Sequence, residues 1–371
     1  MSKLLPLLLI CLILATLTHV FSVKNNNTGV YVKKGNLFWC VLAFVLICFA
    51  GLRIRYNDTA MYIHAYNLWM STGLEASEIS LEIGDNPGFH LLNLLMMKLK
   101  WSSQSFLMFY SALTIGIYLW FIRKYSNNLW LSIFLFIVAS GYVLTLAAIK
   151  QCVAMAFAMV GVDRWLEGKR ISFALWILLG TTFHPYALMY LITPFLMFCP
   201  WSGKTYLMIF AFFVIGISLQ ALMGTVINIT TMLGEEYTAS SFSGEGVNPF
   251  RLAVVAVPTL ISFITQPVIR TKNDRTNNLF MNFTMLNATV MFVALFGTAN
   301  YFGRLANYFT VFQTISMPWL LSQFDRKGRT VLTAVAMGCY LLYFYYQYSI
   351  SGPFDQQYSA ITLSEYLHSI F

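Results

Sequence analysis

The chain has 371 residues, of which 58% are hydrophobic, 17% aromatic and only 10% charged, and its mean hydropathy is +0.67. A soluble globular domain is about 25% charged, so this composition excludes a soluble enzyme and a disordered chain. The apolar residues are spread along the whole sequence in continuous runs, which excludes a soluble domain on one anchor and the alternating pattern of a β-barrel. We predict an all-α, polytopic integral membrane protein that forms one domain over residues 1–371.

Twelve apolar segments have about the length that a helix needs to cross a hydrocarbon core about 30 Å thick. They are predicted at 4–22, 36–52, 102–122, 129–148, 151–166, 171–184, 186–199, 205–224, 252–269, 279–299, 305–322 and 330–349. The three between 151 and 199 are short enough to be half-helices or a kinked hairpin around His184-Pro185. The predicted number of spans therefore ranges from 10 to 13.

The first apolar segment also resembles a signal peptide, because Lys3 precedes a short hydrophobic run. No small-x-small cleavage site follows it, and Lys24, Lys33 and Lys34 come where an exported mature chain disfavours positive charge. We therefore predict that this segment is retained as a membrane span.

The distribution of charge indicates the orientation, because cytoplasmic loops carry an excess of Lys and Arg. With the N-terminus outside, 15 of the 23 basic residues and four of the 14 acidic residues lie on the cytoplasmic side. The net charge is then +11 inside and −2 outside, and both termini lie outside. The overall charge of +9 is thereby explained by topology, and no nucleic-acid partner is expected.

Two outer loops are predicted, at 53–101 and 225–251. Within the first, residues 88–100 are too short and too amphipathic to span, so we expect a helix that lies in the outer interface of the bilayer. In the second, Glu235, Glu236 and Glu245 are expected to form a solvated face.

Cations at the outer ends of the predicted spans are the main candidates for a binding site, since the topology rule does not explain them. They are Arg53, Arg55, Lys150, Arg251 and Arg304. Guanidinium groups bind phosphate bidentately, so together these residues predict an anion site. The alternative is that each cation pairs with a nearby acid or caps a helix end.

His184 and Asp58 are the candidate catalytic residues. His184 precedes Pro185, which stops a helix and frees backbone carbonyls that are tolerated at membrane depth only where they face protein or water. A histidine there can act as a general base, bind a phosphate, or serve only as a structural hydrogen-bonding group. Asp58 is either a salt-bridge partner of the nearby arginines or a carboxylate that positions a sugar hydroxyl.

Motifs of several other functions are absent from the sequence. There is no Walker loop, HExxH or GxSxG motif, and the six cysteines lack metal-ligand spacing. We therefore expect no metal and no cofactor.

These residues resemble motifs of the EpsG family of polysaccharide polymerases, which is similar in role to Wzy proteins. Gly51-Leu52-Arg53 followed by Asp58 and Tyr62 resembles the family's GLR…D..Y opening. Further matches are Asn86-Pro87-Gly88-Phe89, Ile149-Lys150-Gln151, Phe183-His184-Pro185-Tyr186-Ala187, and Arg304 with Tyr308-Phe309. The resemblance covers residues 40 to 320, with one departure: Lys150 stands where the family has Arg, which keeps the charge but loses the planar fork.

The resemblance implies a glycosyltransferase of a bacterial inner membrane that makes O-antigen, capsule or exopolysaccharide. It would join undecaprenyl-diphosphate-linked oligosaccharides at the outer face, with undecaprenyl diphosphate as leaving group, and a chain-length regulator protein is an optional further partner. The five outer cations would hold the diphosphate, His184 or Asp58 would activate the acceptor hydroxyl, and further residues would support the site. These supporting residues are Gln151, Tyr62, Tyr301 and Tyr308.

Two other classes stay open at the level of sequence. Twelve spans also suit a lipid-linked oligosaccharide flippase or another secondary transporter, although such proteins place their sites near the bilayer midplane. The third class is another outer-face transferase, either an O-antigen ligase-like enzyme or an acyltransferase that uses His184.

Overall fold

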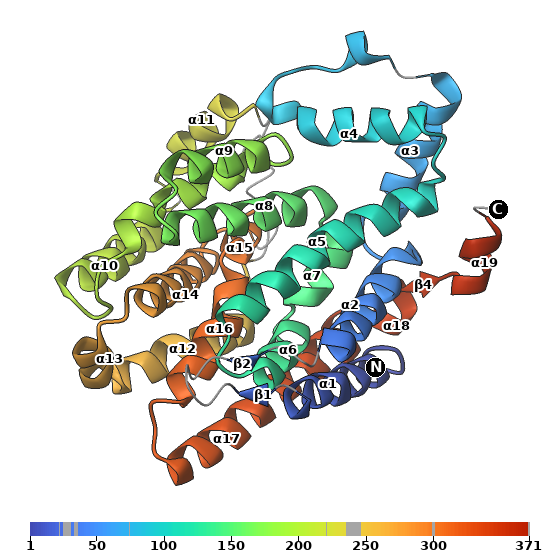
Figure 1. The fold of residues 1–371 in the computed structure, drawn as a ribbon. Coiled ribbons are helices and arrows are strands. Elements are labelled where there is room, and N and C mark those ends of the chain that lie inside the picture. The colour runs from blue at the N-terminus through green and yellow to red at the C-terminus, as the bar shows by residue number, and fades with distance from the viewer. Residues whose placement is uncertain are drawn as a thin grey trace.

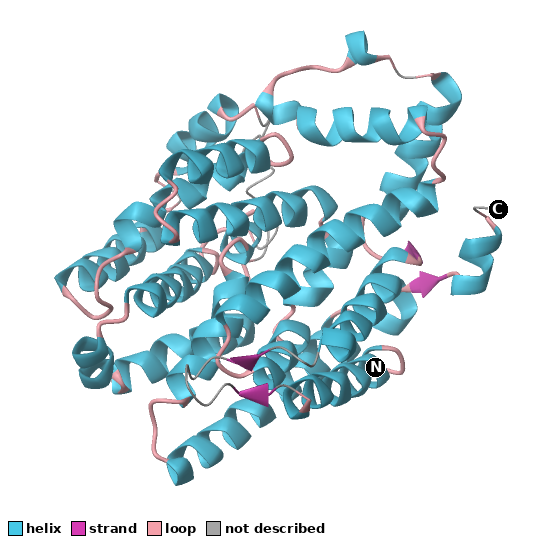
Figure 2. Cartoon of the chain, viewed as in Figure 1, coloured by secondary structure: helices cyan, strands magenta, loops and turns pink. Residues whose placement is uncertain are grey.

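The structure is a computed structural model that describes residues 1–21, 23–24, 31–32, 36–73, 75–219, 221–234, 246–298 and 301–369. Within these ranges the chain is almost entirely helical, which confirms the predicted all-α class (Figure 2). The strands described are very short and form two antiparallel pairs, β1 (Val23–Lys24) with β2 (Tyr31–Val32) and β3 (Arg53–Arg55) with β4 (Ser359–Ala360).

The first part of the chain folds into α-helices and two short 3₁₀ turns. These are α1 (Leu4–Val20), α2 (Asn36–Gly51), α3 (Thr59–Thr72), η1 (Ala76–Glu78), η2 (Ile83–Asp85), α4 (Pro87–Lys98), α5 (Ser103–Tyr125), α6 (Leu129–Val138), α7 (Gly141–Ala147), α8 (Ile149–Leu166) and α9 (Arg170–Thr181).

The second part begins with a long 3₁₀ helix, η3 (Pro185–Leu196), and contains a π-helix, η5 (Tyr346–Ser351). Its α-helices are α10 (Gly203–Ile217), α11 (Met223–Met232), α12 (Pro249–Ile264), α13 (Gln266–Lys272), α14 (Arg275–Val293), α15 (Phe302–Asn307), α16 (Thr310–Leu321), α17 (Arg326–Tyr345), α18 (Phe354–Gln357) and α19 (Leu363–His368).

Each of the twelve segments predicted as spans contains helix, but 129–148, 252–269 and 305–322 are each divided between two helices, and twelve membrane crossings are not confirmed. By length and composition, α5 is the described helix that is long and apolar enough to cross a membrane. Two bent pairs, α6 with α7 at 46° and α12 with α13 at 69°, raise this number to three if each pair is one span. Five further apolar helices are shorter: α1, α2, α9, η3 and α10.

The interior of the bundle contains polar groups that are satisfied by other parts of the protein. Asn282 of α14 donates hydrogen bonds to the carbonyls of Leu196 and Phe198, both at 2.8 Å. On the same helix the Thr284 hydroxyl lies 3.1 Å from that of Ser316 in α16. Polar groups away from water must be paired, so these bonds tie α14 to its neighbours.

The helix predicted at 88–100 is present as α4, which lies with α3 across one end of the molecule (Figure 1). Its start is fixed by Gly88, whose N–H donates to the carbonyl of Thr182 at 2.9 Å. A Cβ atom at Gly88 would lie 2.2 Å from Oγ1 of Thr182, so only glycine permits this approach. The amphipathic helix is thereby joined to the break between α9 and η3.

Glu235, Glu236 and Glu245, predicted to form a solvated face, lie outside the described residues. The predicted second outer loop, 225–251, is described only at its two ends, by α11 and by the start of α12.

Candidate functional site

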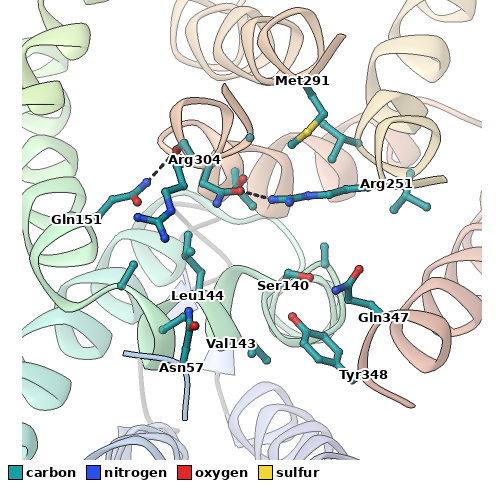
Figure 3. Close-up of a pocket in the computed structure, with 18 of the residues that line it drawn as sticks. Asn57, Ser140, Val143, Leu144, Gln151, Arg251, Met291, Arg304, Gln347 and Tyr348 are labelled. Carbon is teal, nitrogen blue, oxygen red and sulfur yellow. Dashed lines mark hydrogen bonds between the residues drawn. The ribbon is translucent and has the colours of Figure 1, made fainter. Parts of the chain in front are cut away.

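A polar cavity of about 340 Å³ lies between the segment after β3, the break between α6 and α7, and helices α7, α8, α12, α14, α15, α16, α17 and η5 (Figure 3). Its charged lining residues are Asp58, Arg251 and Arg304. Its polar side chains are mostly amides and tyrosine hydroxyls, which can both donate and accept hydrogen bonds. They include Tyr56, Asn57, Gln151, Asn307, Gln313, Tyr343, Gln347 and Tyr348.

Helices break or change type around this cavity. Ser140, between α6 and α7, has a positive φ of 68°, and Ala148 separates α7 from α8. On another wall, α17 passes into the π-helix η5, which contributes Gln347 and Tyr348. Broken backbone at membrane depth is tolerated where it lines a cavity, and π-helices are frequent at functional sites. The local geometry therefore makes this cavity the candidate functional site.

Arg304 is the best-placed cation for a ligand. Its backbone is held by Gln151, whose side-chain Nε2 donates to the Arg304 carbonyl at 2.9 Å. The Arg304 side chain is exposed and points into the cavity (Figure 3). Over the described residues, its guanidinium group has no hydrogen bond or ion pair with the protein. Its five donors are therefore free for an anion.

Arg251 enters the same cavity from α12. Its Nη2 donates to Oδ1 of Asn307 at 2.7 Å, which directs the guanidinium toward α15. In Figure 3, Arg251 lies on the side of the cavity opposite Gln151. Two of the five predicted cations are thus brought to one cavity.

His184 is not one of the described residues that line this cavity; it is hydrogen-bonded to Tyr308, the residue that follows Asn307 of the lining. Its Nδ1 is 2.8 Å from the Tyr308 hydroxyl, and its ring lies 5.3 Å from that of Tyr186 between centroids. The charges of Lys150 and Arg304 act on His184. The structure therefore brings together His184, Tyr308, Lys150 and Arg304, all of which were candidates from sequence.

Lys150 and Tyr301 contribute to the surroundings of His184. Nζ of Lys150 lies 5.0 Å from the centroid of the Phe89 ring, which belongs to α4. The Tyr301 ring packs edge-on against Tyr186 with centroids 5.9 Å apart. Helix α4 thus contacts Lys150, whose charge acts on His184.

Asp58 lines the cavity at the start of α3 and makes no capping hydrogen bond with its side chain. The charges of Asp58 and Arg304 both act on the hydroxyl of Tyr62, one turn later in α3. The Tyr62 ring also packs edge-on against Phe89 at 5.9 Å. These contacts connect α3 to both the cavity and α4.

Arg53 and Arg55 lie outside the lining of the cavity. Arg53 is 1% exposed and donates to the Ala50 carbonyl, to Thr59 Oγ1 at 3.0 Å and to Ser111 Oγ at 3.2 Å. Arg55 is exposed on β3 and pairs through its backbone with Ser359 of β4. The sequence predicted that Arg53 and Arg55 would lie near the other outer cations. It did not predict whether their side chains would face the cavity.

Two polar side chains that the sequence analysis missed are His90 and Gln313. Burial and the charge of Lys150 lower the pKa of His90, while Asp85 opposes them. Gln313 is 1% exposed and lines the cavity, yet its Oε1 has no hydrogen-bond partner among the residues that the structure describes. His90 could have been noticed, because it lies three residues after Pro87 in an amphipathic helix. Gln313 could not, because it lies inside an apolar segment.

Fold and site together define an all-α membrane protein with a cation-bearing polar cavity. A model of the EpsG family matches residues 36–362, so the protein belongs to the EpsG family, as its motifs predicted. This family indicates a polymerase-like membrane protein of polysaccharide biosynthesis. No curated protein and no solved structure was found to match the chain.

Proposed function

We propose that the protein polymerises undecaprenyl-diphosphate-linked oligosaccharide units at the outer face of a bacterial cytoplasmic membrane. The observation that carries this proposal is the guanidinium group of Arg304, which lines the polar cavity, makes no hydrogen bond or ion pair within the described residues, and acts electrostatically on His184 of the His184–Tyr308 pair. Such a site offers an anion-binding group, room for sugar hydroxyls and a base within one small region. The transfer of a glycan from a diphosphate leaving group to a hydroxyl requires all three.

In this proposal, Arg304 and Lys150 bind the diphosphate of the donor. A hydroxyl of the incoming lipid-linked unit attacks the anomeric carbon, the bond from that carbon to the diphosphate oxygen breaks, and its electron pair leaves with undecaprenyl diphosphate. The cations stabilise the charge that develops on this leaving group. Nε2 of His184 accepts the hydroxyl proton, and the amides and tyrosines of the cavity hold the sugars.

Arg251 and Asp58 line the cavity. Arg251 is proposed to donate to phosphate or hydroxyl oxygens there, and the Asp58 carboxylate to accept a hydrogen bond from a sugar hydroxyl. Arg53, by contrast, is proposed to position β3 and the adjacent start of α3, because its donors are already used within the protein. The reaction as proposed uses no metal. In the described part of the chain, no group of three or more His, Cys, Asp and Glu residues is arranged to hold one.

The membrane arrangement is also part of the proposal. Twelve spans with both termini outside would place α4 at the outer interface and the basic residues of α13 and the start of α17 inside. Figure 1 supports this, because α4 lies at one end of the molecule and α13 and the start of α17 lie toward the other. A chain-length regulator is proposed as a partner that limits the number of joined units.

The test compares the glycan ladder of a strain that lacks the protein with strains that carry variants. We expect the deletion to leave a single-repeat band, and the wild-type protein to restore the ladder. Arg304→Ala should reduce polymer about 10–100-fold, the cost of one or two charge-assisted hydrogen bonds. Arg304→Lys should recover part of it.

Lys204→Ala is the matched control, since Lys204 is an exposed cation on α10 away from the cavity. It should leave the ladder unchanged, and all variants should reach wild-type protein levels. A full ladder in the deletion strain would refute polymerisation.

A flippase is the second candidate, because the bends of 46° and 69° in α6–α7 and α12–α13 are of the kind seen in transporters. Loss of a flippase would keep lipid-linked units on the cytoplasmic side. Loss of a polymerase would leave single repeats on the outer side, so the location of the units separates the two functions.

A further inference from the structure

A second recess of about 420 Å³ lies on the other side of α15 from the polar cavity. Its walls come from η3, α10, α14, α15 and the residue before α16, and every lining residue is apolar. They are Leu188, Met189, Ile192, Phe212, Ile215, Leu286, Val290, Val293, Phe302, Leu305 and Phe309. Below, this recess is called the apolar groove.

The short helix α15 forms a common wall of the groove and the polar cavity. Its residues Phe302 and Leu305 face the groove, whereas Gly303, Arg304 and Asn307 face the cavity. Arg304 and Leu305 are therefore adjacent in sequence but line different compartments. The apolar groove and the Arg304 guanidinium group therefore lie on opposite sides of the short helix α15.

The helix η3 connects the groove to His184. It begins at Pro185, directly after His184, and its residues Leu188, Met189 and Ile192 line the groove. A 3₁₀ helix rises about 2 Å per residue, so Leu188 lies about 8 Å along the axis from His184. One end of the groove is thus close to the candidate catalytic residue.

The groove is a recess in the protein rather than an outward-facing helix surface. Phe309, Val293 and Leu286 line it and yet are 3% exposed or less. Its wall also depends on Gly297, because a Cβ atom there would lie 2.4 Å from the Phe302 ring. Phe302 can therefore occupy its place only if residue 297 has no side chain.

We propose that the apolar groove binds the polyprenyl chain of the lipid-linked substrate, with its diphosphate at Arg304 and Lys150. This inference rests on the proposed function and assigns the lipid part of its substrate to a site. The polyprenyl diphosphate is the ligand that this arrangement favours. Its phosphate is bonded directly to the end of its apolar chain, so it needs an apolar groove and a cation only a helix turn apart. A glycerophospholipid carries a glycerol unit between its chains and its phosphate, which fits this spacing less well.

The test uses the purified full chain in vesicles of phosphatidylethanolamine and phosphatidylglycerol, with a polyprenyl diphosphate that carries a photoreactive diazirine in its chain. After irradiation, the labelled peptides are identified by mass spectrometry. We expect labels on η3, α14 and α15, and competition by unlabelled undecaprenyl diphosphate. Extra phosphatidylglycerol should not compete.

Val290→Trp fills the groove and should reduce this labelling about tenfold, a change of 1.4 kcal/mol in binding. Val293→Phe is a milder second variant in case the first does not fold. Ile217→Trp is the matched control, since Ile217 is exposed on α10 and lies outside the groove lining; it should label like the wild type.

Equal competition by phosphatidylglycerol, or undiminished labelling of a folded Val290→Trp or Val293→Phe protein, would overturn the assignment of the groove. Labelling requires no polymerisation, so it is independent of the glycan ladder. Specific labelling together with an unchanged ladder in the deletion strain would refute the polymerase function but support lipid binding in the groove. Loss of the ladder in the deletion strain without specific labelling would refute only lipid binding in the groove.

Discussion

The Tyr308 hydroxyl and Nδ1 of His184 lie 2.8 Å apart, although 124 positions separate the two residues in the chain. The contact joins the break between α9 and η3 to the segment between α15 and α16. In the tautomer in which Nδ1–H of His184 donates to the Tyr308 oxygen, Nε2 carries no proton and is the ring nitrogen that can accept one. Tyr308 thus orients the His184 ring. The Tyr190 hydroxyl in turn donates a hydrogen bond to the backbone carbonyl of Tyr308.

Tyr308→Phe removes this hydrogen bond and keeps the ring. We expect the rate of polymer formation to fall about 10-fold, and His184→Ala to lower it about 100-fold or more, the range for loss of a general base. The measurement is the initial rate of ladder formation at equal protein levels. His64→Ala, on the exposed face of α3, is the control and should be neutral, whereas a wild-type rate for Tyr308→Phe would exclude a role in orienting His184.

The fold class could be predicted because composition and apolar runs are properties of the sequence itself. The positions of helices at 4–22, 36–52 and 102–122 follow from those runs, and each is found within a few residues. The form of the backbone did not follow: residues 186–199 read as an apolar helix, but η3 is a 3₁₀ helix over Pro185–Leu196. That form depends on packing against neighbours that are distant in sequence.

The site could be predicted only in part. Arg304, His184, Lys150 and Tyr308 were proposed from topology and motifs, and the structure brings them together. Gln313 could not be found, because an amide inside an apolar run has no pattern that marks it as cavity-lining. Whether a cation faces the cavity or the protein interior depends on its tertiary acceptors, which for Arg53 come partly from α5.

Arg53→Ala tests whether Arg53 supports the fold or binds substrate directly. Its loss leaves the Ala50 carbonyl and the hydroxyls of Thr59 and Ser111 without this donor in a buried place, and each group left unpaired costs about 1–3 kcal/mol. We therefore expect a lower Tm in detergent and less folded protein. A variant with wild-type Tm that still makes no polymer would instead show that Arg53 contacts the substrate.

Glu167 gives a pH-dependent contribution to stability at the end of α8. Hydrogen bonds from Lys169 and Lys124 lower the pKa of its carboxyl from 4.5 to about 2. A carboxyl whose pKa is lower in the folded state stabilises the fold above its unfolded pKa, and this contribution disappears as the pH falls from 4.5 toward 2. The Tm difference between wild type and Glu167→Gln should therefore be present at pH 7 and shrink below pH 4.5. Glu82→Gln, on an exposed turn, is the control, and its Tm difference from wild type should not vary with pH.

A Tm difference for Glu167→Gln that stayed constant with pH would contradict a stabilising role of its ion pairs with Lys124 and Lys169.

Gly88→Ala tests whether α4 must approach the break beside His184. The added methyl group would lie 2.2 Å from Oγ1 of Thr182, so α4 has to move away and the hydrogen bond from residue 88 to the Thr182 carbonyl lengthens. We expect a cost of about 1–3 kcal/mol, as for other overpacked positions, and a loss of polymer because Phe89 and its partner Lys150 shift with the helix. Tm in detergent and the glycan ladder measure the two effects. Gly116→Ala is the matched control, since a Cβ atom there meets nothing within 4 Å, and it should keep both the Tm and the ladder. If Gly88→Ala also kept both, the contact between α4 and Thr182 would have no part in forming the site.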